Sequence, residues 1–83
     1  MPLYIDHHKH VNGLTAEAVA DAHRKDLEVQ DKQDAKALRY WFNEGKEEVF
    51  CLIDAPSAEA AADLHREAHG LMADEITEVE AGS

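Results

Sequence analysis

Only one cysteine, Cys51, occurs among the 83 residues, so the chain forms no internal disulfide. This cysteine use is typical of a reducing compartment, and we expect a cytoplasmic protein. No apolar run approaches the roughly 18 residues of a membrane span, and the start of the chain lacks the layout of a signal peptide. The length predicts a single domain, 1–83, whose small core needs a metal ion or a partner subunit to support it.

Basic side chains are scarce. Lys and Arg number 8 against 18 Asp and Glu, which gives an acidic protein with a net charge of −10. Phosphate backbones and anionic membrane surfaces repel such a charge, so we expect neither nucleic-acid nor membrane binding. The sequence also contains no Gly-rich phosphate loop, no CxxC pair and no nucleophile elbow, so no motif of this kind assigns a small-molecule ligand.

Apolar periodicity and turn residues predict six elements along the chain. The strands are expected at 3–10, 37–43, 48–54 and 74–80, and the helices run from the N-caps Thr15 and Ser57 to about Gln33 and Gly70. This βαββαβ order predicts an α+β, ferredoxin-like sandwich. In that fold a four-stranded antiparallel sheet carries two helices on one face, and the first and third strands are central.

Five successive apolar residues in the third strand, Val49 to Ile53, predict burial on both faces of the sheet. The aromatic run Tyr40–Phe42 in the neighbouring strand also predicts burial on both faces. Because the helices cover one face only, a second copy of the chain is the simplest cover for the other, and we expect a homodimer. The alternative is a monomer with a few exposed aromatic side chains.

Six histidines provide most of the candidate chemistry. His65 and His69 are one helical turn apart and can reach a single ion. His23 falls with Leu27 on the apolar side of the first helix. His23 and His65 each follow their helix N-cap by eight residues, so antiparallel helices would bring them to a similar height. The alternative is that these rings are core or surface histidines with ordinary hydrogen bonds.

Asp6, His8 and His10 alternate along the first strand and therefore share a face. They could bind a metal ion on the sheet face away from the core or at its edge; a solvated strand end is the alternative. Cys51 lies in an apolar strand, where a free cysteine is usually a small buried hydrophobe. It could also serve as a soft metal ligand, whereas an apolar, acidic setting disfavours a catalytic thiol.

Several short segments, taken in order, resemble the small nickel-binding proteins of actinobacterial type, which belong to a larger family of unknown function. The resemblance spans nearly the whole chain. It rests on residues 6–8, 12–15, 22–27, 51–52, 55–60, 65–70 and 73–76 and on Glu78-Val79.

The resemblance implies a ferredoxin-like fold, a homodimer and bound nickel. The positions that match its segments give the predicted metal ligands as His8, His23, His65 and His69, followed by Asp6 and Cys51, whereas His7 and His10 look like additions in this chain. Nickel(II) accepts imidazole and carboxylate ligands, and zinc or copper would bind the same groups, so the sequence does not select the ion.

We therefore expect a non-enzymatic protein that binds nickel or another divalent transition metal for storage, buffering or sensing. The alternative is a dimeric α+β enzyme or small-molecule binder, in which His23 or His65 acts as a general base oriented by Asp26 or Asp6. A deep apolar pocket containing His23 would favour that alternative. In a third interpretation the chain is an interaction module with structural histidines.

Overall fold

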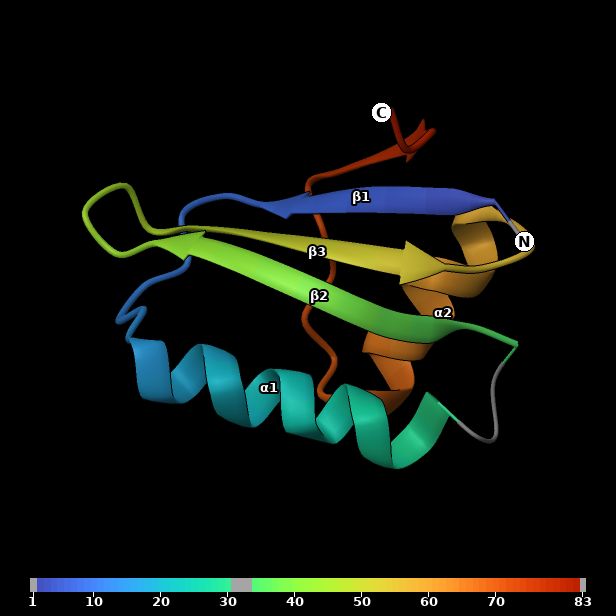
Figure 1. Cartoon of the computed structure of the whole chain (residues 1–83). Coiled ribbons are helices and arrows are strands. Elements are labelled where there is room, and N and C mark those ends of the chain that lie inside the picture. Colours follow the sequence, from blue (N-terminus) through green and yellow to red (C-terminus); the bar gives the residue numbers. More distant parts are fainter. Residues whose placement is uncertain (1, 31–33, 83) are drawn as a thin grey trace.

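The elements follow one another in the order β1–α1–β2–β3–α2–β4 in the computed structural model, which describes residues 2–30 and 34–82. The elements are β1 (Leu3–His8), α1 (Ala16–Val29), β2 (Lys36–Asn43), β3 (Glu48–Asp54), α2 (Ala58–Ala68) and β4 (Glu75–Val79). All strand pairs are antiparallel, and the order β2-β3-β1-β4 makes β1 and β3 central. Both helices lie on one side of the sheet (Figure 1). The predicted ferredoxin-like arrangement is confirmed.

Hydroxyl caps begin both helices where the sequence predicts them. The Thr15 hydroxyl oxygen accepts a hydrogen bond from the Ala18 amide at 3.1 Å, and that of Ser57 accepts one from the Ala60 amide at 3.1 Å. Each cap satisfies a backbone N–H that the first turn leaves without a partner.

The helix ends are less well predicted. Helix α1 ends at Val29, so the expectation that it continues to about Gln33 is too long; residues 31–33 lie outside the described residues. Helix α2 ends where Gly70 adopts φ +78°, and the Gly70 amide donates to the His65 carbonyl at 2.9 Å. Glycine enters this left-handed region at no steric cost, so the predicted terminator at Gly70 is confirmed.

The buried side of α1 differs from the predicted one. Leu27, expected on the apolar face, is 43% exposed, whereas Asp26 is only 2% exposed. The physical reason is that Asp26 meets two histidines of the α2 segment, His65 and His69. The side of α1 that carries Asp26 therefore packs against α2, and Leu27, the next residue, stays partly exposed.

Strand β1 ends at His8 rather than at His10. His10 adopts φ +56° and is exposed, so it does not continue the row formed by Asp6 and His8. The sequence pattern predicts Asp6 and His8 on the face away from the core or at its edge. Instead, both are buried beneath α2. The predicted ladder therefore exists for two residues, on the helix-covered side.

The two faces of the sheet are covered unequally. Alternate residues of β3 are buried against the helices: Val49, Cys51 and Ile53. Phe50 and Leu52, on the other face, are only partly buried by their neighbours. No helix among the described residues covers that outer face (Figure 1).

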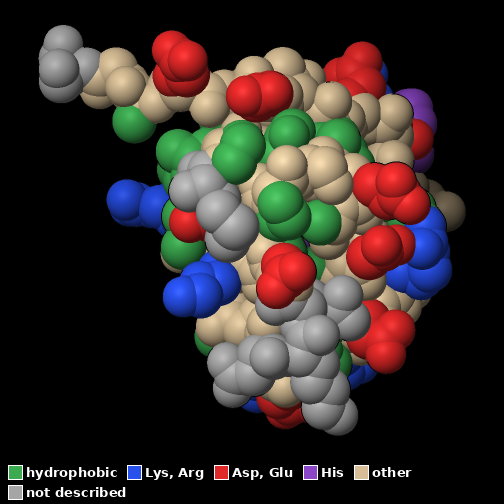
Figure 2. All heavy atoms as spheres, turned by 90° about the vertical axis from the view of Figure 1, so that its right-hand side faces the viewer, with side chains coloured by type: hydrophobic (Ala, Val, Ile, Leu, Met, Phe, Trp, Pro, Cys, Tyr) green, Lys and Arg blue, Asp and Glu red, His purple; other side chains and the backbone are tan. Residues whose placement is uncertain are grey.

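Acidic side chains are scattered over the molecular surface at the end nearest the N-terminus (Figure 2). This distribution agrees with the net charge of −10. Among residues 2–30 and 34–82, no helix has the length and apolar character needed to cross a membrane.

Candidate metal centre

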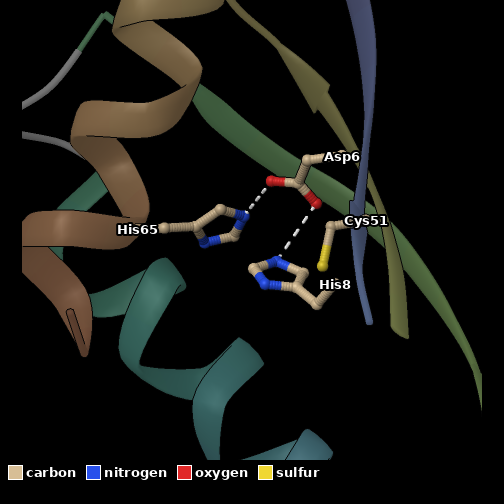
Figure 3. Close-up of side chains that lie close together, drawn as sticks. All are labelled: Asp6, His8, Cys51 and His65. Atoms are coloured by element: carbon tan, nitrogen blue, oxygen red, sulfur yellow. Dashed lines mark ion pairs between the residues drawn. The ribbon is translucent and has the colours of Figure 1, made fainter. Parts of the chain in front are cut away.

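Four potential ligands converge between the sheet and α2. They are Asp6 and His8 from β1, Cys51 from β3 and His65 from α2, and the four ligand atoms all lie within 4.8 Å of one another. All four side chains are buried. Figure 3 shows both imidazoles directed toward the Asp6 carboxylate, with the Cys51 sulfur beside the His8 ring.

Strand register explains the convergence. Asp6 pairs directly with Cys51 across β1 and β3, so the two side chains leave the sheet on the same face. His8 lies two residues beyond Asp6 and therefore shares that face. His65 projects from the middle of α2, on the same helix side as the core residue Leu64.

Polar atoms of this cluster lack ordinary hydrogen bonds. Asp6 Oδ1 lies 3.4 Å from His8 Nε2, and Asp6 Oδ2 is in close contact with His65 Nε2. Neither contact has the geometry of an ordinary hydrogen bond, so Asp6 holds His8 and His65 as charge-paired contacts. Buried polar atoms are normally satisfied. Converging atoms that are held by charge and lack ordinary hydrogen bonds are suited to a cation.

Charges within the cluster stabilise one another. Burial alone would raise the pKa of Asp6, but His65 and His8 outweigh it and lower the pKa to about 2. Burial would lower the pKa of His8, but Asp6 and Cys51 raise it to about 9. Burial opposes protonation of His65 as well, yet Asp26, Asp6 and Cys51 raise its pKa to about 12. In the metal-free protein His8 and His65 therefore each hold an additional proton, which a divalent cation would replace.

A second group of potential ligands shares His65 with the first. His65 Nδ1 lies 2.9 Å from Asp26 Oδ1, and His69 Nε2 lies 3.1 Å from the same oxygen. Burial would raise the pKa of Asp26, but His65 and His69 lower it below its ordinary value. His65 is thus held between two carboxylates, with Asp6 at one ring nitrogen and Asp26 at the other.

A cavity of about 430 Å³ adjoins the cluster. His8, Cys51 and His65 form part of its lining, and His23 contributes to its wall. Most of the remaining lining is apolar: Val11, Leu14, Ala18, Val19, Ala22, Val49, Leu71 and Met72. The cavity has a size typical of sites for small molecules.

The structure separates the six predicted ligands. Asp6, His8, Cys51 and His65 come together, and His69 joins His65 at Asp26. His23 belongs to neither group of described residues; its ring lies 4.8 Å from the ring of Tyr40. His23 and His65 share a cavity but make no described contact with each other.

The two histidines that looked like additions lie apart from these groups. His7 points to the outer sheet face, where its ring stacks on Phe50 and its Nε2 lies 3.0 Å from Glu48. His10 is exposed at the edge of the cavity.

Sequence reasoning considered Asp26 only as a group that orients a catalytic base and missed its place between His65 and His69. A signal existed. Asp26 follows His23 by three residues and therefore lies on the same side of the helix, facing the cavity.

Donor chemistry and fold define the class: a small ferredoxin-like α+β protein with buried imidazole, carboxylate and thiol groups that suit a borderline transition-metal ion. The family model described as "Nickel responsive protein SCO4226-like" matches residues 4–79. The chain belongs to this SCO4226-like family of nickel-responsive proteins.

A solved relative agrees with the fold. The crystal structure of SCO4226 from Streptomyces coelicolor A3(2) is 32% identical, with a TM-score of 0.89, and the match covers 98% of this chain and 99% of that one. No curated protein matches the chain. The resemblance inferred from the sequence is therefore confirmed at the level of the family.

Proposed function

We propose that this protein binds nickel(II) as a non-enzymatic storage, buffering or sensing protein, with Asp6, His8, Cys51 and His65 as the ligands. The observation that carries the proposal is the convergence of four buried donor atoms within 4.8 Å of one another. The family description, nickel responsive, supports the choice of ion.

Charge balance supports a divalent cation in this cluster. The Asp6 carboxylate and a Cys51 thiolate supply two negative charges, while His8 and His65 coordinate as neutral imidazoles. A bound divalent ion would then leave no net charge among these groups in a buried place, where an uncompensated charge is costly. An all-oxygen site would suit magnesium or calcium, whereas these nitrogen and sulfur donors suit nickel, zinc or copper.

His69 and His23, also predicted as ligands, take different parts in this proposal. His69 Nε2 faces Asp26 rather than the cluster, so we place it outside the first coordination shell. His23 lines the cavity next to the cluster and could reach the ion only through a water molecule or a small ligand held there.

Calorimetry on chelator-treated protein tests the proposal, with nickel chloride and zinc chloride titrated separately. Wild-type protein should bind nickel saturably at micromolar concentration, and His8→Ala should weaken this binding at least about 100-fold, because a ligand is lost. His10→Ala is the matched control, since His10 lies in neither ligand group and is exposed. Equal affinity of H8A and H10A, or no saturable nickel binding, would exclude the proposed centre.

Cys51 gives an independent optical test. Nickel bound to a thiolate shows a sulfur-to-metal charge-transfer absorption that nickel bound only to nitrogen and oxygen lacks. Titrating wild-type protein with nickel should produce this band, and Cys51→Ser should abolish it. A band that persists in C51S would remove Cys51 from the ligand set.

We also propose that the protein acts as a homodimer in the cytoplasm. The outer sheet face supports a second copy because Trp41 is 44% exposed there, beside the partly buried Phe50 and Leu52. Helix-free apolar faces of this kind are commonly closed by a symmetric partner. A reducing compartment would keep the Cys51 thiol available to a metal ion.

A second candidate function, small-molecule binding or catalysis, is favoured by the cavity that contains His23. His65, with a pKa of about 12, is protonated at neutral pH and is a poor general base. His23 is the better candidate for that role. A metal-free ligand that binds wild-type protein but not His23→Ala, with nickel binding unchanged, would support this function.

A further inference from the structure

We propose that Asp26 and His69 are positioning residues, which present His65 to the metal through Nε2 and couple the centre to the segment 70–72 at the mouth of the cavity. This inference rests on the proposed metal-binding function. It concerns Asp26, His69 and the Leu71 amide, which lie on the Nδ1 side of His65, rather than the proposed ligands on its Nε2 side.

The hydrogen on His69 can be located from its partners. His69 Nδ1 accepts a hydrogen bond from the Leu71 amide at 3.1 Å, so this nitrogen carries a lone pair. The hydrogen of the neutral ring is therefore on Nε2, which lies 3.1 Å from Asp26 Oδ1. A backbone amide thus fixes the tautomer of His69 and directs its N–H at a buried carboxylate.

Asp26 in turn fixes His65. Its Oδ1 accepts from His65 Nδ1 at 2.9 Å, so the hydrogen of a neutral His65 is on Nδ1. The lone pair is then on Nε2, the nitrogen that faces Asp6. A histidine ligand whose other nitrogen donates to a carboxylate is held in orientation and becomes more basic toward the metal.

This assignment decides between two interpretations of Asp26, His65 and His69. As a separate metal site, the group would need lone pairs on His65 Nδ1 and His69 Nε2. In the structure these two nitrogens face one carboxylate oxygen, and His69 Nδ1 is already an acceptor. The geometry favours a single ion on the Nε2 side of His65, with Asp26 and His69 on its Nδ1 side.

The chain of hydrogen bonds ends at the cavity mouth. Leu71 and Met72 line the cavity and are 53% and 45% exposed. The Leu71 amide is tied to His69, and Gly70, with φ +78°, turns the backbone between them. A metal that orders His65 would therefore also restrain Leu71, through Asp26 and His69.

Asp26→Asn is the first test, made by calorimetry with nickel chloride. It should lower nickel affinity about 10–100-fold without changing the number of ions bound, as loss of an outer-shell carboxylate does. Asp21→Asn removes the same charge from the same helix, at a side chain that is 48% exposed, and should leave the affinity unchanged. Loss of one binding event with the remaining affinity unaltered would instead make Asp26 a ligand of a second ion, and unchanged binding would exclude its positioning role.

His69→Phe provides a second variant that keeps the ring but not the hydrogen bonds, in case D26N does not fold. Amide hydrogen exchange at Leu71 should slow on nickel addition in wild-type protein, and this slowing should disappear in H69F. Equal slowing in both proteins would overturn the coupling to the cavity mouth.

Nitrogen-15 NMR of the histidine rings separates this inference from the proposed function. In metal-free protein His69 should show a protonated Nε2 and an acceptor Nδ1, and the same should hold in H8A, whose metal centre is disrupted. The opposite tautomer would overturn the positioning role whether or not nickel binds. Absence of nickel binding with the expected tautomer would count against the proposed function alone.

Discussion

The two faces of the sheet differ in which side chains depart from the usual distribution: the covered face holds apolar core residues such as Val49 and Ile53 but also buries charged groups. The helix-covered face buries Asp6, His8 and Cys51, whereas the outer face presents Phe50 and Leu52 without a helix over them. Soluble domains more often bury the apolar face and leave the polar one to water. Here the covered face buries charged groups that stabilise only one another, and the outer face leaves Phe50 and Leu52 partly exposed.

The difference suggests that the two faces serve two binding events. The covered face has converging atoms that lack ordinary hydrogen bonds, which a cation would satisfy. The outer face has apolar area, which a second copy of the chain would bury. The following predictions separate these roles, because each changes one face, or neither, and measures the property assigned to it.

The largest effect is expected from Asp6→Asn on the covered face. Removing this carboxylate leaves two buried, protonated imidazoles, His8 and His65, with less compensating charge. Loss of one partner of a buried ion pair costs about 3–5 kcal/mol. Urea unfolding of metal-free protein at pH 6 would measure the loss, and a change below about 1 kcal/mol would contradict the described ion pairs.

Trp41→Ala tests the outer face. A large aromatic side chain at the centre of an interface contributes about 2 kcal/mol or more, so subunit association should weaken about 30-fold. Leu27→Ala is a matched control, because Leu27 is 43% exposed on α1 while Trp41 is 44% exposed on β2. Sedimentation would measure association, and a monomeric wild-type protein at micromolar concentration would exclude the proposed dimer.

A smaller effect is expected from pH on the metal-free protein. The pKa of His8 is raised from 6.5 to about 9, so the folded chain holds this proton more tightly than the unfolded chain. The resulting stability is fully present below pH 6.5 and is lost as the pH rises through about 9. We expect the unfolding free energy to fall by about 1–3 kcal/mol over this window.

His65, with a pKa of about 12, stays protonated across that window, so the loss belongs to His8. Thermal unfolding in matched buffers from pH 6 to pH 9 would measure it. His8→Gln should flatten the profile, and an equally steep profile in H8Q would assign the titration to another group.

The smallest effect is expected away from both faces. Thr15→Ala removes the hydrogen bond to the Ala18 amide at the start of α1 and should cost about 1 kcal/mol. Nickel affinity and subunit association should both remain unchanged. A change in either would mean that α1 is coupled to the centre more tightly than its contacts indicate.

The fold was predictable because local signals agreed. The caps Thr15 and Ser57, the terminator Gly70 and the period of the strands all indicated βαββαβ, and the structure has that order. The end of α1 and the end of β1 were not predictable. They depend on a backbone conformation at His10 and on tertiary contacts that periodicity does not contain.

The candidate site was predictable in part. Alternation along β1 placed Asp6 and His8 on one face, but which face depends on where the helices lie. The contacts of Asp26 were not predicted because a single acid on a helix is usually solvated. Only the packing of α1 against α2 gives Asp26 two imidazole partners. His23 fits the apolar pattern yet ends beside Tyr40, since small differences in helix rotation move a side chain from one neighbour to another.

The cross-strand pairing of Asp6 with Cys51 has a practical consequence. A slip of β1 by a single residue would turn His7, rather than Asp6 and His8, toward the helices and so dismantle the cluster. Metal uptake would then serve as a sensor of correct strand alignment. An assay of bound nickel could sort well-formed molecules from misaligned ones in a library of redesigned sheets, without solving any of their structures.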